Sequence, residues 1–454
     1  MGVVDELRRG LPAEAMVTDP DLLESYRRDE TAFVAAGTPL VCVLPTATSH
    51  VQHVMRVASA AKVPVVTQGA RSGLAGGANA IDGCIVLSLL RMNRIVEINP
   101  VDRLAVVEPG VTNADLSRAV AELGLFYPPD PASWEFSTIG GNIATNAGGL
   151  CCVKYGVTAE YVLGLEVVLA SGEVFRTGRR TVKGVAGYDL TRLLVGSEGT
   201  LGVITQATLA LRPAAAPPIT LAAVFGSTAA AGAAVTAIMT SGAAPALLEI
   251  IDRVHLRAIE AYRPMGLDTS AAAVLIAQCD TAGQAAGDLA AIAQTCRDAG
   301  ASEVVEASDA AESAMLLEAR RAAYPAMERL GAVIVDDVAV PRSRLVDLLD
   351  GVERIARECD VTIGVVGHAG DGNMHPNIVV AHGDTAALER GRRAFEAIME
   401  LGLALGGTVT GEHGVGVLKR GWLQTELGPV GTRVSAAVRA AFDPERILNP
   451  DKVI

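Results

Sequence analysis

The sequence lacks several patterns that define common classes of protein. It has no Cys-x-x-Cys pair, and its 7 cysteines are scattered singly apart from Cys151-Cys152, which argues against an iron–sulfur cluster or a zinc ribbon. No unbroken apolar run approaches the ~20 residues of a membrane span. Residues 1–10 have mixed charge and no apolar core, unlike a signal peptide. We therefore expect a protein of the reducing cytoplasm that is not an integral membrane protein.

Basic charge is also in short supply. The chain has 38 basic against 51 acidic residues, a net charge of -13, which argues against nucleic acid or an anionic membrane as the main partner. Neither the Rossmann fingerprint in its strand–turn–helix context nor the P-loop pattern is present. Half of the 454 residues are apolar, and a chain of this length is expected to fold as two or three domains.

The composition of the sequence and its predicted elements change twice along the chain. Up to residue 212 it is rich in short strands and glycine turns, and the proline-rich stretch 213–218 reads as a linker. We expect domains at 1–212, 213–405 and 406–454, the last rich in glycine loops. Strands are predicted at 41–44, 63–67, 85–89, 95–98, 105–107, 162–170, 202–211, 219–225, 247–251 and 274–277, and helices at 49–61, 226–239, 252–262, 281–299 and 384–405.

The most informative segment is 367–375, Gly-His-Ala-Gly-Asp-Gly-Asn-Met-His. Asp371-Gly372, between two apolar runs, predicts a two-residue hairpin turn whose central positions both need positive φ. Counting outward, His368 should face His375, with Cβ atoms roughly 4.5–5.5 Å apart. Two imidazoles at that separation can share one metal ion, and Glu412 downstream could be a third ligand. Three protein ligands with an open position are typical of a catalytic site.

A purely structural role is the alternative for these histidines. Three of the 7 histidines fall in two glycine-rich segments that each carry an acid, which favours a metal or active site. Asn377 lies two residues past His375 and shares that face of the strand. It is therefore expected to hydrogen-bond a ligand that the metal holds.

Three glycine-rich segments come earlier in the chain. Residues 68–77 follow a strand, and their backbone N–H groups can surround a phosphate, although a tight structural turn is an equal alternative. Residues 137–149 include four glycines, two asparagines and two threonines. So little bulk cannot form a core, but it can line a flat, polar, elongated ligand. The third segment, 185–205, ends in a strand.

These segments, the hairpin, Gly-Glu-His-Gly-Val-Gly at 411–416 and the closing Ile-Leu-Asn-Pro-Asp-Lys at 447–452 carry a resemblance. In this order they resemble the FAD-dependent D-2-hydroxy-acid dehydrogenases of the vanillyl-alcohol-oxidase superfamily, which include the glycolate oxidase FAD subunit, D-lactate dehydrogenase and D-2-hydroxyglutarate dehydrogenase. The resemblance covers nearly the whole chain. It implies an α+β fold: a PCMH-type FAD-binding domain of two α+β subdomains, an α+β cap (substrate) domain, and a C-terminal segment that returns to the flavin.

The resemblance implies FAD as the cofactor. The implied FAD-binding residues are Gly69, Ser72, Gly73, Gly76 and Gly77 at the pyrophosphate; Pro129, Asp130, Ser133, Gly140, Gly141, Asn142, Ala144, Ala147 and Gly148 along the isoalloxazine, ribityl and pyrophosphate; Glu198, Gly202 and Ile204 at the adenosine end; and Asn449 from the tail. Arg71 replaces the second glycine of the family's Gly-x-Gly-Thr loop, so its side chain must point away from the phosphates or act as a cation. The loop lacks the histidine that holds flavin covalently in related oxidases, so non-covalent FAD is expected.

The resemblance also implies a reaction. In the family, the residues matching His368, His375 and Glu412 bind a divalent metal, often zinc or manganese, which holds the carboxylate and C2 hydroxyl of a 2-hydroxy acid. The cation favours loss of the hydroxyl proton, His413 is placed to accept it, and the C2 hydride passes to flavin N5. Arg320 matches the family's carboxylate-binding arginine, whose fork suits a carboxylate. A solvated helix residue is the alternative for Arg320.

Members specific for 2-hydroxyglutarate carry a lysine where this chain has Val335 and Asp336. This departure favours a small monocarboxylate such as glycolate or D-lactate. D-2-hydroxyglutarate oxidation, and the role of a FAD-binding subunit in a multi-subunit glycolate oxidase, stay as alternatives. A flavin-free metal hydrolase, a non-catalytic FAD subunit and an aryl-alcohol, sugar or alkyl-glycerone-phosphate flavoenzyme explain fewer of the motifs.

The sequence leaves the electron acceptor open. A quinone, a cytochrome, an electron-transfer flavoprotein or an iron–sulfur subunit would each serve, and an acceptor at the membrane would make the protein peripheral to it. A homodimer is left open as well.

Overall fold

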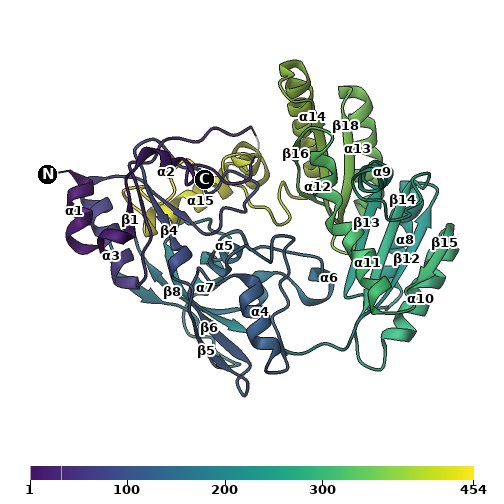
Figure 1. Cartoon of the computed structure of the whole chain (residues 1–454), viewed down its shortest axis with the longest axis horizontal. Coiled ribbons are helices and arrows are strands. Elements are labelled where there is room, and N and C mark those ends of the chain that lie inside the picture. Colours follow the sequence, from purple (N-terminus) through teal and green to yellow (C-terminus); the bar gives the residue numbers. More distant parts are fainter. Residues whose placement is uncertain (1, 32) are drawn as a thin grey trace. The chain divides into compact units, whose positions relative to one another are not determined.

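The computed structural model describes residues 2–31 and 33–454. The chain divides into two compact units (Figure 1). The first consists of Met1–Gly148, Val157–Ala214 and Glu412–Ile454, and the second of Gly149–Gly156 and Ala215–Gly411.

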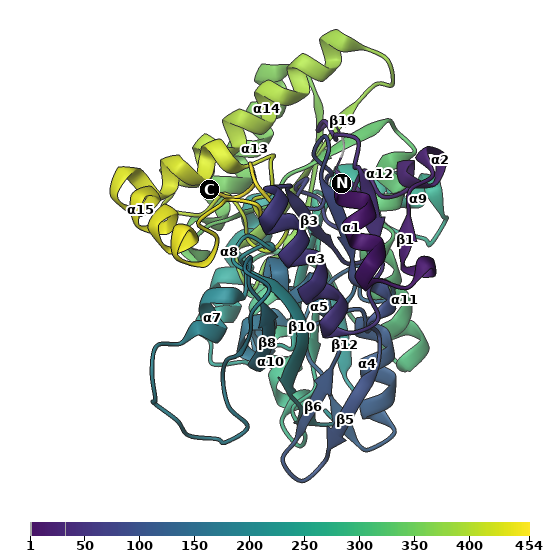
Figure 2. The ribbon, with the colours of Figure 1, turned by 90° about the vertical axis from the view of Figure 1, so that its left-hand side faces the viewer.

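The first unit contains three sheets. The four-stranded sheet has the order β1 (Met16–Val17), β2 (Val41–Val43), β4 (Ile85–Ser88) and β3 (Val65–Gln68). The five-stranded sheet has the order β5 (Ile95–Asn99), β6 (Leu104–Val107), β10 (Val203–Ala210), β8 (Val162–Val168) and β9 (Val174–Arg176), and its inner strands lie side by side in Figure 2. A small pair joins β7 (Leu125–Phe126) to β11 (Arg212–Pro213).

Among its described residues, the first unit has seven helices. They are α1 (Val3–Gly10), α2 (Pro20–Glu24), α3 (Thr48–Ala61), α4 (Asn113–Ala121), α5 (Ile139–Thr145), α7 (Leu190–Leu194) and α15 (Arg420–Phe442), with 3-10 turns at Ala13–Ala15, Leu89–Arg91 and Thr158–Glu160. One apolar cluster joins α1 and α3 to the four-stranded sheet and reaches Val168 and Val203 of the five-stranded sheet. Burial of this surface is the main force that holds the two sheets together.

The second unit is one antiparallel sheet covered by helices. Its strand order is β15 (Ala301–Glu306), β12 (Ile219–Phe225), β14 (Ala273–Cys279), β13 (Leu247–Asp252), β18 (Thr362–His368), β19 (Asn373–Val380) and β16 (Ala332–Val335), and β17 (Val338–Ala339) also pairs with β19. The helices are α6 (Cys152–Tyr155), α8 (Thr228–Thr240), α9 (Arg253–Tyr262), α10 (Ala285–Asp298), α11 (Ala310–Arg321), α12 (Ala323–Glu328), α13 (Leu345–Cys359) and α14 (Thr385–Ala404), with a 3-10 turn at Arg342–Arg344.

Most predicted elements are confirmed, with ends shifted by a few residues. The uncharged stretch 213–248 forms a buried strand and an alanine-rich helix, β12 and α8, as expected. The predicted glycine-loop tail is wrong, because it contains the 23-residue helix α15. Gly428 (φ 65°) and Pro429 interrupt this helix, and only Arg439 is buried along it, so it shows little of the apolar periodicity by which helices are predicted.

The predicted register of the β18–β19 hairpin is also wrong. His368 pairs with Asn373, and Val366 pairs with His375. The Asp371 amide donates to His368 O (3.0 Å) and the Gly372 amide to Ala369 O (3.2 Å), so the loop has four residues instead of two. Only Gly372, at 76°, has positive φ in this loop, which is incompatible with the expected turn because both of its central residues need positive φ.

None of the helices within residues 2–31 and 33–454 is long and apolar enough to cross a bilayer.

Candidate active site

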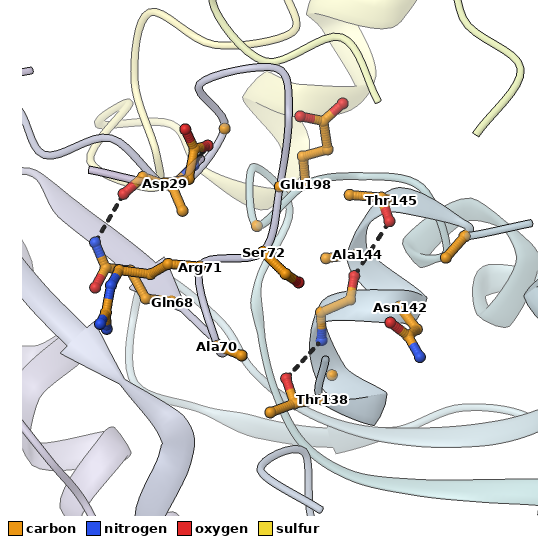
Figure 3. A pocket seen from close by; sticks show the side chains of 18 of the residues that line it. Asp29, Gln68, Ala70, Arg71, Ser72, Thr138, Asn142, Ala144, Thr145 and Glu198 are labelled. Atoms are coloured by element: carbon orange, nitrogen blue, oxygen red, sulfur yellow. Dashed lines mark hydrogen bonds between the residues drawn. The ribbon is translucent and has the colours of Figure 1, made fainter. Parts of the chain in front are cut away.

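The three glycine-rich segments meet at one cavity in the first unit (Figure 3). Of the residues expected to bind the cofactor, those that line it are Gly69, Ser72, Gly73, Gly77, Ser133, Gly140, Gly141, Asn142, Ala144, Ala147, Gly148, Glu198, Gly202 and Ile204. Glu412 and His413 line the same cavity. The structure thus gathers segments that are far apart in the sequence around one space.

Glycines, which have no side chain, allow these segments to approach each other. Thr138 caps α5 by accepting the Gly141 amide at 3.3 Å. A Cβ atom on Gly69 would lie 2.4 Å from Thr138 Oγ1, and one on Gly148 would lie 2.4 Å from Glu412 Oε2. Any side chain at these two positions would push the cavity walls apart.

Buried polar atoms test whether the cavity suits a flavin. Within the described ranges, Thr67 Oγ1 and Asn142 Nδ2 are buried without a hydrogen-bond partner, and both residues line the cavity. An unsatisfied buried donor costs free energy, so a ligand with matching polar groups is needed. The elongated, polar and flat-ringed FAD provides such groups, and the residues therefore fit the cofactor.

Arg71, the departure in the first loop, has φ 60°. Its guanidinium lies 5.1 Å from the centre of the Tyr26 ring, and its side chain runs beside Gln68 (Figure 3). The positive φ is easier for glycine than for arginine, and the cation–π contact offsets part of that cost.

The tail returns to the cavity, as the fold prediction requires. The Asn449 amide donates to Val65 O at 2.8 Å, and Asn449 Nδ2 donates to Gly77 O (3.0 Å) and Glu198 O (2.8 Å). Asn449 therefore braces the cavity wall from behind. Gly76, Pro129 and Asp130 lie outside the set of lining residues as well.

Glu198, one of the residues that line the cavity, has a buried carboxyl group. It accepts the amides of Val415 (2.7 Å) and Gly416 (2.9 Å). Burial raises the pKa of Glu198 to about 7, against these two hydrogen bonds and the charges of Lys419 and Lys452. Glu198 therefore joins the third glycine-rich segment to the tail while its charge is partly suppressed.

In the second unit, His368 and His375 lie on the same face of the β18–β19 hairpin. The observed pairing makes them diagonal neighbours, and their ring centroids are 5.1 Å apart. Both side chains are buried. The two imidazoles are therefore close enough to share an ion although the predicted pairing is wrong.

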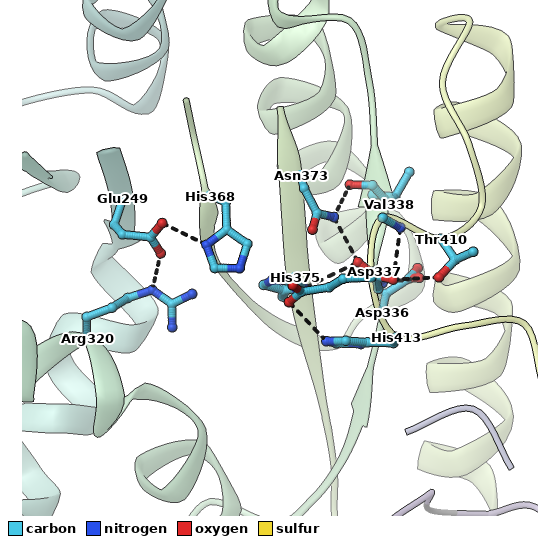
Figure 4. Close-up of polar contacts among 12 residues, drawn as sticks. Glu249, Arg320, Asp336, Asp337, Val338, His368, Asn373, His375, Thr410 and His413 are labelled. Carbon is cyan, nitrogen blue, oxygen red and sulfur yellow. Dashed lines mark hydrogen bonds and ion pairs between the residues drawn. The ribbon is translucent and has the colours of Figure 1, made fainter. Parts of the chain in front are cut away.

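Glu249, on β13, was not expected from the sequence. It accepts hydrogen bonds from Arg320 Nε (2.6 Å) and from His368 Nδ1 (2.7 Å) and is fully buried (Figure 4). Burial alone would raise the pKa of Glu249, but the charges and hydrogen bonds of His368 and Arg320 outweigh it and lower the pKa. The one feature of the sequence that could have drawn attention to Glu249 is that it directly follows the uncharged stretch 213–248.

Asp337 is a second carboxylate that sequence reasoning missed. Its oxygens accept Asn373 Nδ2 (2.8 Å), Thr410 Oγ1 (2.7 Å) and the Gly411 amide (2.9 Å). Its Oδ1 lies 3.6 Å from His375 Nδ1. Asp337 thus ties residues 410–411 to the histidine-bearing strand, as Figure 4 shows for Thr410.

Val335 and Asp336 lie at the edge of the same sheet. Val335 pairs with Asn377, and the Asp336 amide donates to Pro376 O at 2.9 Å. Since side chains alternate along a strand, Val335 is on the face of Asn377 and Asp336 is on the opposite face. Of the two residues at the position of the family's lysine, Val335 therefore shares the face of Asn377 and Asp336 does not.

Comparison with solved structures identifies the fold. p-Cresol methylhydroxylase aligns with a TM-score of 0.82 at 19% identity, covering 99% of this chain and 96% of that one. Alkyldihydroxyacetonephosphate synthase aligns with a TM-score of 0.78 at 17% identity, covering 99% and 85%. At such low identity these likenesses show the fold alone, which is the α+β, PCMH-type FAD-binding fold.

Family models and relatives narrow the class. The FAD binding domain model matches residues 39–178, and the model for the C-terminal domain of FAD linked oxidases matches residues 217–453. The chain therefore belongs to the FAD-linked oxidase family and is a FAD-dependent oxidoreductase, which confirms the resemblance drawn from the motifs.

Three relatives illustrate this family. The glycolate oxidase subunit GlcD of Bacillus subtilis is 43% identical over 91% of this chain and 89% of its own length, and that of Escherichia coli K12 is 37% identical over 100% and 91%. The D-lactate dehydrogenase of Anaerostipes hadrus is 33% identical over 99% and 97%.

Proposed function

We propose that this chain oxidises a small D-2-hydroxy acid, glycolate or D-lactate, to the 2-oxo acid. The observation that carries the proposal is the buried pair His368 and His375, 5.1 Å apart at the ring centroids, next to the Glu249-held Arg320. The names of the relatives, glycolate oxidase subunit and D-lactate dehydrogenase, support this substrate class.

The proposal includes a divalent metal, zinc or manganese, held by His368, His375 and Glu412. Two imidazoles and a carboxylate suit such an ion. Glu249 engages Nδ1 of His368, which leaves Nε2 as the metal donor, and a carboxylate commonly orients a metal-binding histidine in this way. Glu412 directly follows Gly411, whose amide Asp337 accepts. The metal would supply a Lewis acid for the C2 hydroxyl.

Arg320 is proposed to bind the substrate carboxylate. Its Nε is used by Glu249, so the two Nη groups are the part of the fork that can meet a ligand. Its side chain is 11% exposed, and a charge-assisted hydrogen bond is stronger in such a site than at the surface.

His413 is proposed to take the proton of the C2 hydroxyl. It lines the flavin cavity, and its Nε2 lies 3.7 Å from Glu412 Oε1, so the proposed base and the proposed third ligand are neighbours. FAD bound in the cavity would supply the acceptor for the C2 hydride. Asn377, on the face of His375, is proposed to hydrogen-bond the substrate.

The electron acceptor is proposed to be a separate protein or a quinone. Two relatives carry names of subunits, which favours a complex in which a partner removes electrons from the flavin. If that partner is at the membrane, the chain would be peripheral to it.

Anaerobic mixing of the oxidised holoenzyme with a panel of D- and L-2-hydroxy acids tests the proposal. Glycolate or D-lactate should bleach the flavin absorbance near 450 nm, while L-lactate should not. A flavin that stays oxidised with every 2-hydroxy acid, in a sample that dithionite reduces, would show that the proposed function is wrong.

A further inference from the structure

A row of three polar side chains, of which His255 and Asn377 are buried, ends at Asn377. Asp252 Oδ1 is 3.0 Å from His255 Nδ1, and His255 Nε2 is 2.8 Å from Asn377 Nδ2. His255 is 0% exposed and Asn377 is 2% exposed. Asp252 is also the N-cap of α9, where it accepts the His255 amide at 2.9 Å, so the helix cap and the ring contact hold His255 together.

The hydrogen bonds in this row have one direction. Asp252 Oδ2 accepts the Val365 amide at 2.7 Å, so both oxygens of Asp252 serve as acceptors and the proton between Asp252 and His255 is on Nδ1. Nε2 lies 2.8 Å from Asn377 Nδ2, and an amide nitrogen can only donate, so Nε2 is the acceptor of this contact. Asn377 must therefore donate through Nδ2, and its amide cannot turn over without placing two acceptors against each other.

The backbone leaves room for this contact at one place. Gly364 pairs with Asn377 across the hairpin, and a Cβ atom there would lie 2.7 Å from His255 Nδ1 and Cε1. The glycine thus opens the space through which the ring of His255 reaches Asn377.

The fixed amide leaves one atom unused. Asn377 Oδ1 is buried and has no hydrogen-bond partner in residues 2–31 and 33–454. Asn377 is two residues from His375 on β19, so the two side chains share a face. An unsatisfied buried acceptor costs free energy, and the cost is removed when a ligand donates to it.

We propose that Asp252 and His255 are positioning residues that make Asn377 present an acceptor, and that this acceptor favours the 2-hydroxy acid over the 2-oxo acid. The inference rests on the proposed function for the identity of the two ligands. Before His413 takes its proton, the C2 hydroxyl of the bound substrate can donate a hydrogen bond to Oδ1. The C2 carbonyl of the product offers only an acceptor, so its oxygen faces another acceptor and the product is bound less well.

The test compares two ligands that the enzyme does not turn over. The metal-loaded holoenzyme is titrated with pyruvate and with 2-hydroxyisobutyrate, which has a C2 hydroxyl but no C2 hydrogen, and binding is read from the flavin spectrum. In His255→Phe the amide of Asn377 is free to turn. We expect the preference for 2-hydroxyisobutyrate over pyruvate to fall about tenfold relative to wild type.

A double-mutant cycle separates positioning from packing. Asn377→Leu should lose the same preference, and His255→Phe/Asn377→Leu should lose no more than Asn377→Leu alone, because His255 acts through Asn377. The control is His382→Phe, a histidine on the surface of the same unit, which should leave the preference unchanged. If His255→Phe weakens both ligands equally, His255 only packs and the inference is overturned.

A second variant keeps the test decisive if His255→Phe does not fold. His255→Gln retains a polar group of similar reach whose own amide can turn, so a smaller loss of preference is expected, and an unchanged preference would overturn the inference. Flavin reduction of the wild type by glycolate or D-lactate is measured in parallel. If the wild-type flavin is reduced but the variants keep the wild-type preference, only the positioning role is contradicted. If the wild-type flavin is not reduced, the proposed function is contradicted.

Discussion

Glu249 holds Arg320 through a 2.6 Å hydrogen bond from Nε, with Glu249 fully buried and the Arg320 side chain 11% exposed. The same carboxylate binds His368, so one acid fixes the proposed carboxylate clamp and a proposed metal ligand. We expect Glu249→Gln to lower kcat/KM by about 10- to 100-fold, as loss of an outer-shell partner of a metal ligand commonly does. The FAD content should stay unchanged, because Glu249 is outside the unit that holds the flavin cavity.

Steady-state kinetics and metal analysis of the purified variant check this expectation. Glu318→Gln is the matched control: Glu318 also pairs with an arginine, Arg263, but both side chains are largely exposed, and such pairs contribute little. If the two variants had the same activity, Glu249 would have no positioning role.

The sequence indicated most of the fold and the parts of the site that local chemistry marks. The glycine-rich segments were expected to line one ligand, and they do share a cavity, because segments without bulk can only fold around something else. The sequence predicts that the two histidines are neighbours, but it does so through a two-residue turn that the structure does not have. The actual loop has four residues, and the resulting diagonal pairing still places the two ring centroids 5.1 Å apart.

Glu249, His255 and Asp337 could not be identified from the sequence. The partner of each is far away in the chain: Glu249 and His368 are 119 residues apart, His255 and Asn377 are 122 apart, and Asp337 and Asn373 are 36 apart. Such contacts arise from packing of the sheet, which a local pattern does not contain. The lysine replacement at Val335 was visible in the sequence, but the face to which Asp336 turns follows from register alone.

Removing His375 tests the proposed metal. His375→Ala should lose the divalent metal and nearly all turnover, because two of the three proposed ligands cannot hold the ion in place. It should keep FAD, since the cavity belongs to the other unit. Metal content by elemental analysis and flavin content by absorbance are measured on the same sample. Fully active wild-type enzyme without metal would rule out the metal.

The flavin is proposed to be non-covalent. The first glycine-rich loop, residues 68–77, contains no histidine that could attach to it. Acid or heat precipitation should therefore leave the yellow colour in the supernatant, with FAD identified there by mass. A pellet that keeps the colour would indicate a covalent bond at another residue.

The buried Glu198 predicts a dependence of stability on pH. Its pKa is about 7 in the folded protein against an ordinary value of 4.5, so the folded state holds this proton while the unfolded chain has released it. Its stabilising contribution is complete below pH ~4.5 and is lost as the pH rises toward ~7, at up to about 1.4 kcal/mol per pH unit.

Glu198→Gln should remove this dependence. Compared with wild type, the variant should gain in relative stability between pH 5 and pH 8, by on the order of 1–3 kcal/mol, as measured by denaturant unfolding at each pH. Glu122→Gln, at an exposed position in the same unit, is the control and should follow wild type. Parallel pH profiles for Glu198→Gln and wild type would mean that Glu198 titrates alike in the folded and unfolded chain.

The last prediction concerns the size and charge of the substrate. Arg320 is the proposed clamp for one carboxylate, and Val335, on the face of Asn377, stands where a second cation would be needed. A second carboxylate there would lose water without gaining a partner, at a cost of several kcal/mol. We therefore expect glycolate or D-lactate to exceed D-2-hydroxyglutarate in kcat/KM by at least about tenfold, or ~1.4 kcal/mol.

Two variants test this expectation. Val335→Lys should narrow the difference in kcat/KM between the small substrates and D-2-hydroxyglutarate. Arg320→Lys should lower kcat/KM for all three substrates, because a point charge cannot replace the planar fork. A higher kcat/KM for D-2-hydroxyglutarate in the wild type would show that another cation serves the second carboxylate.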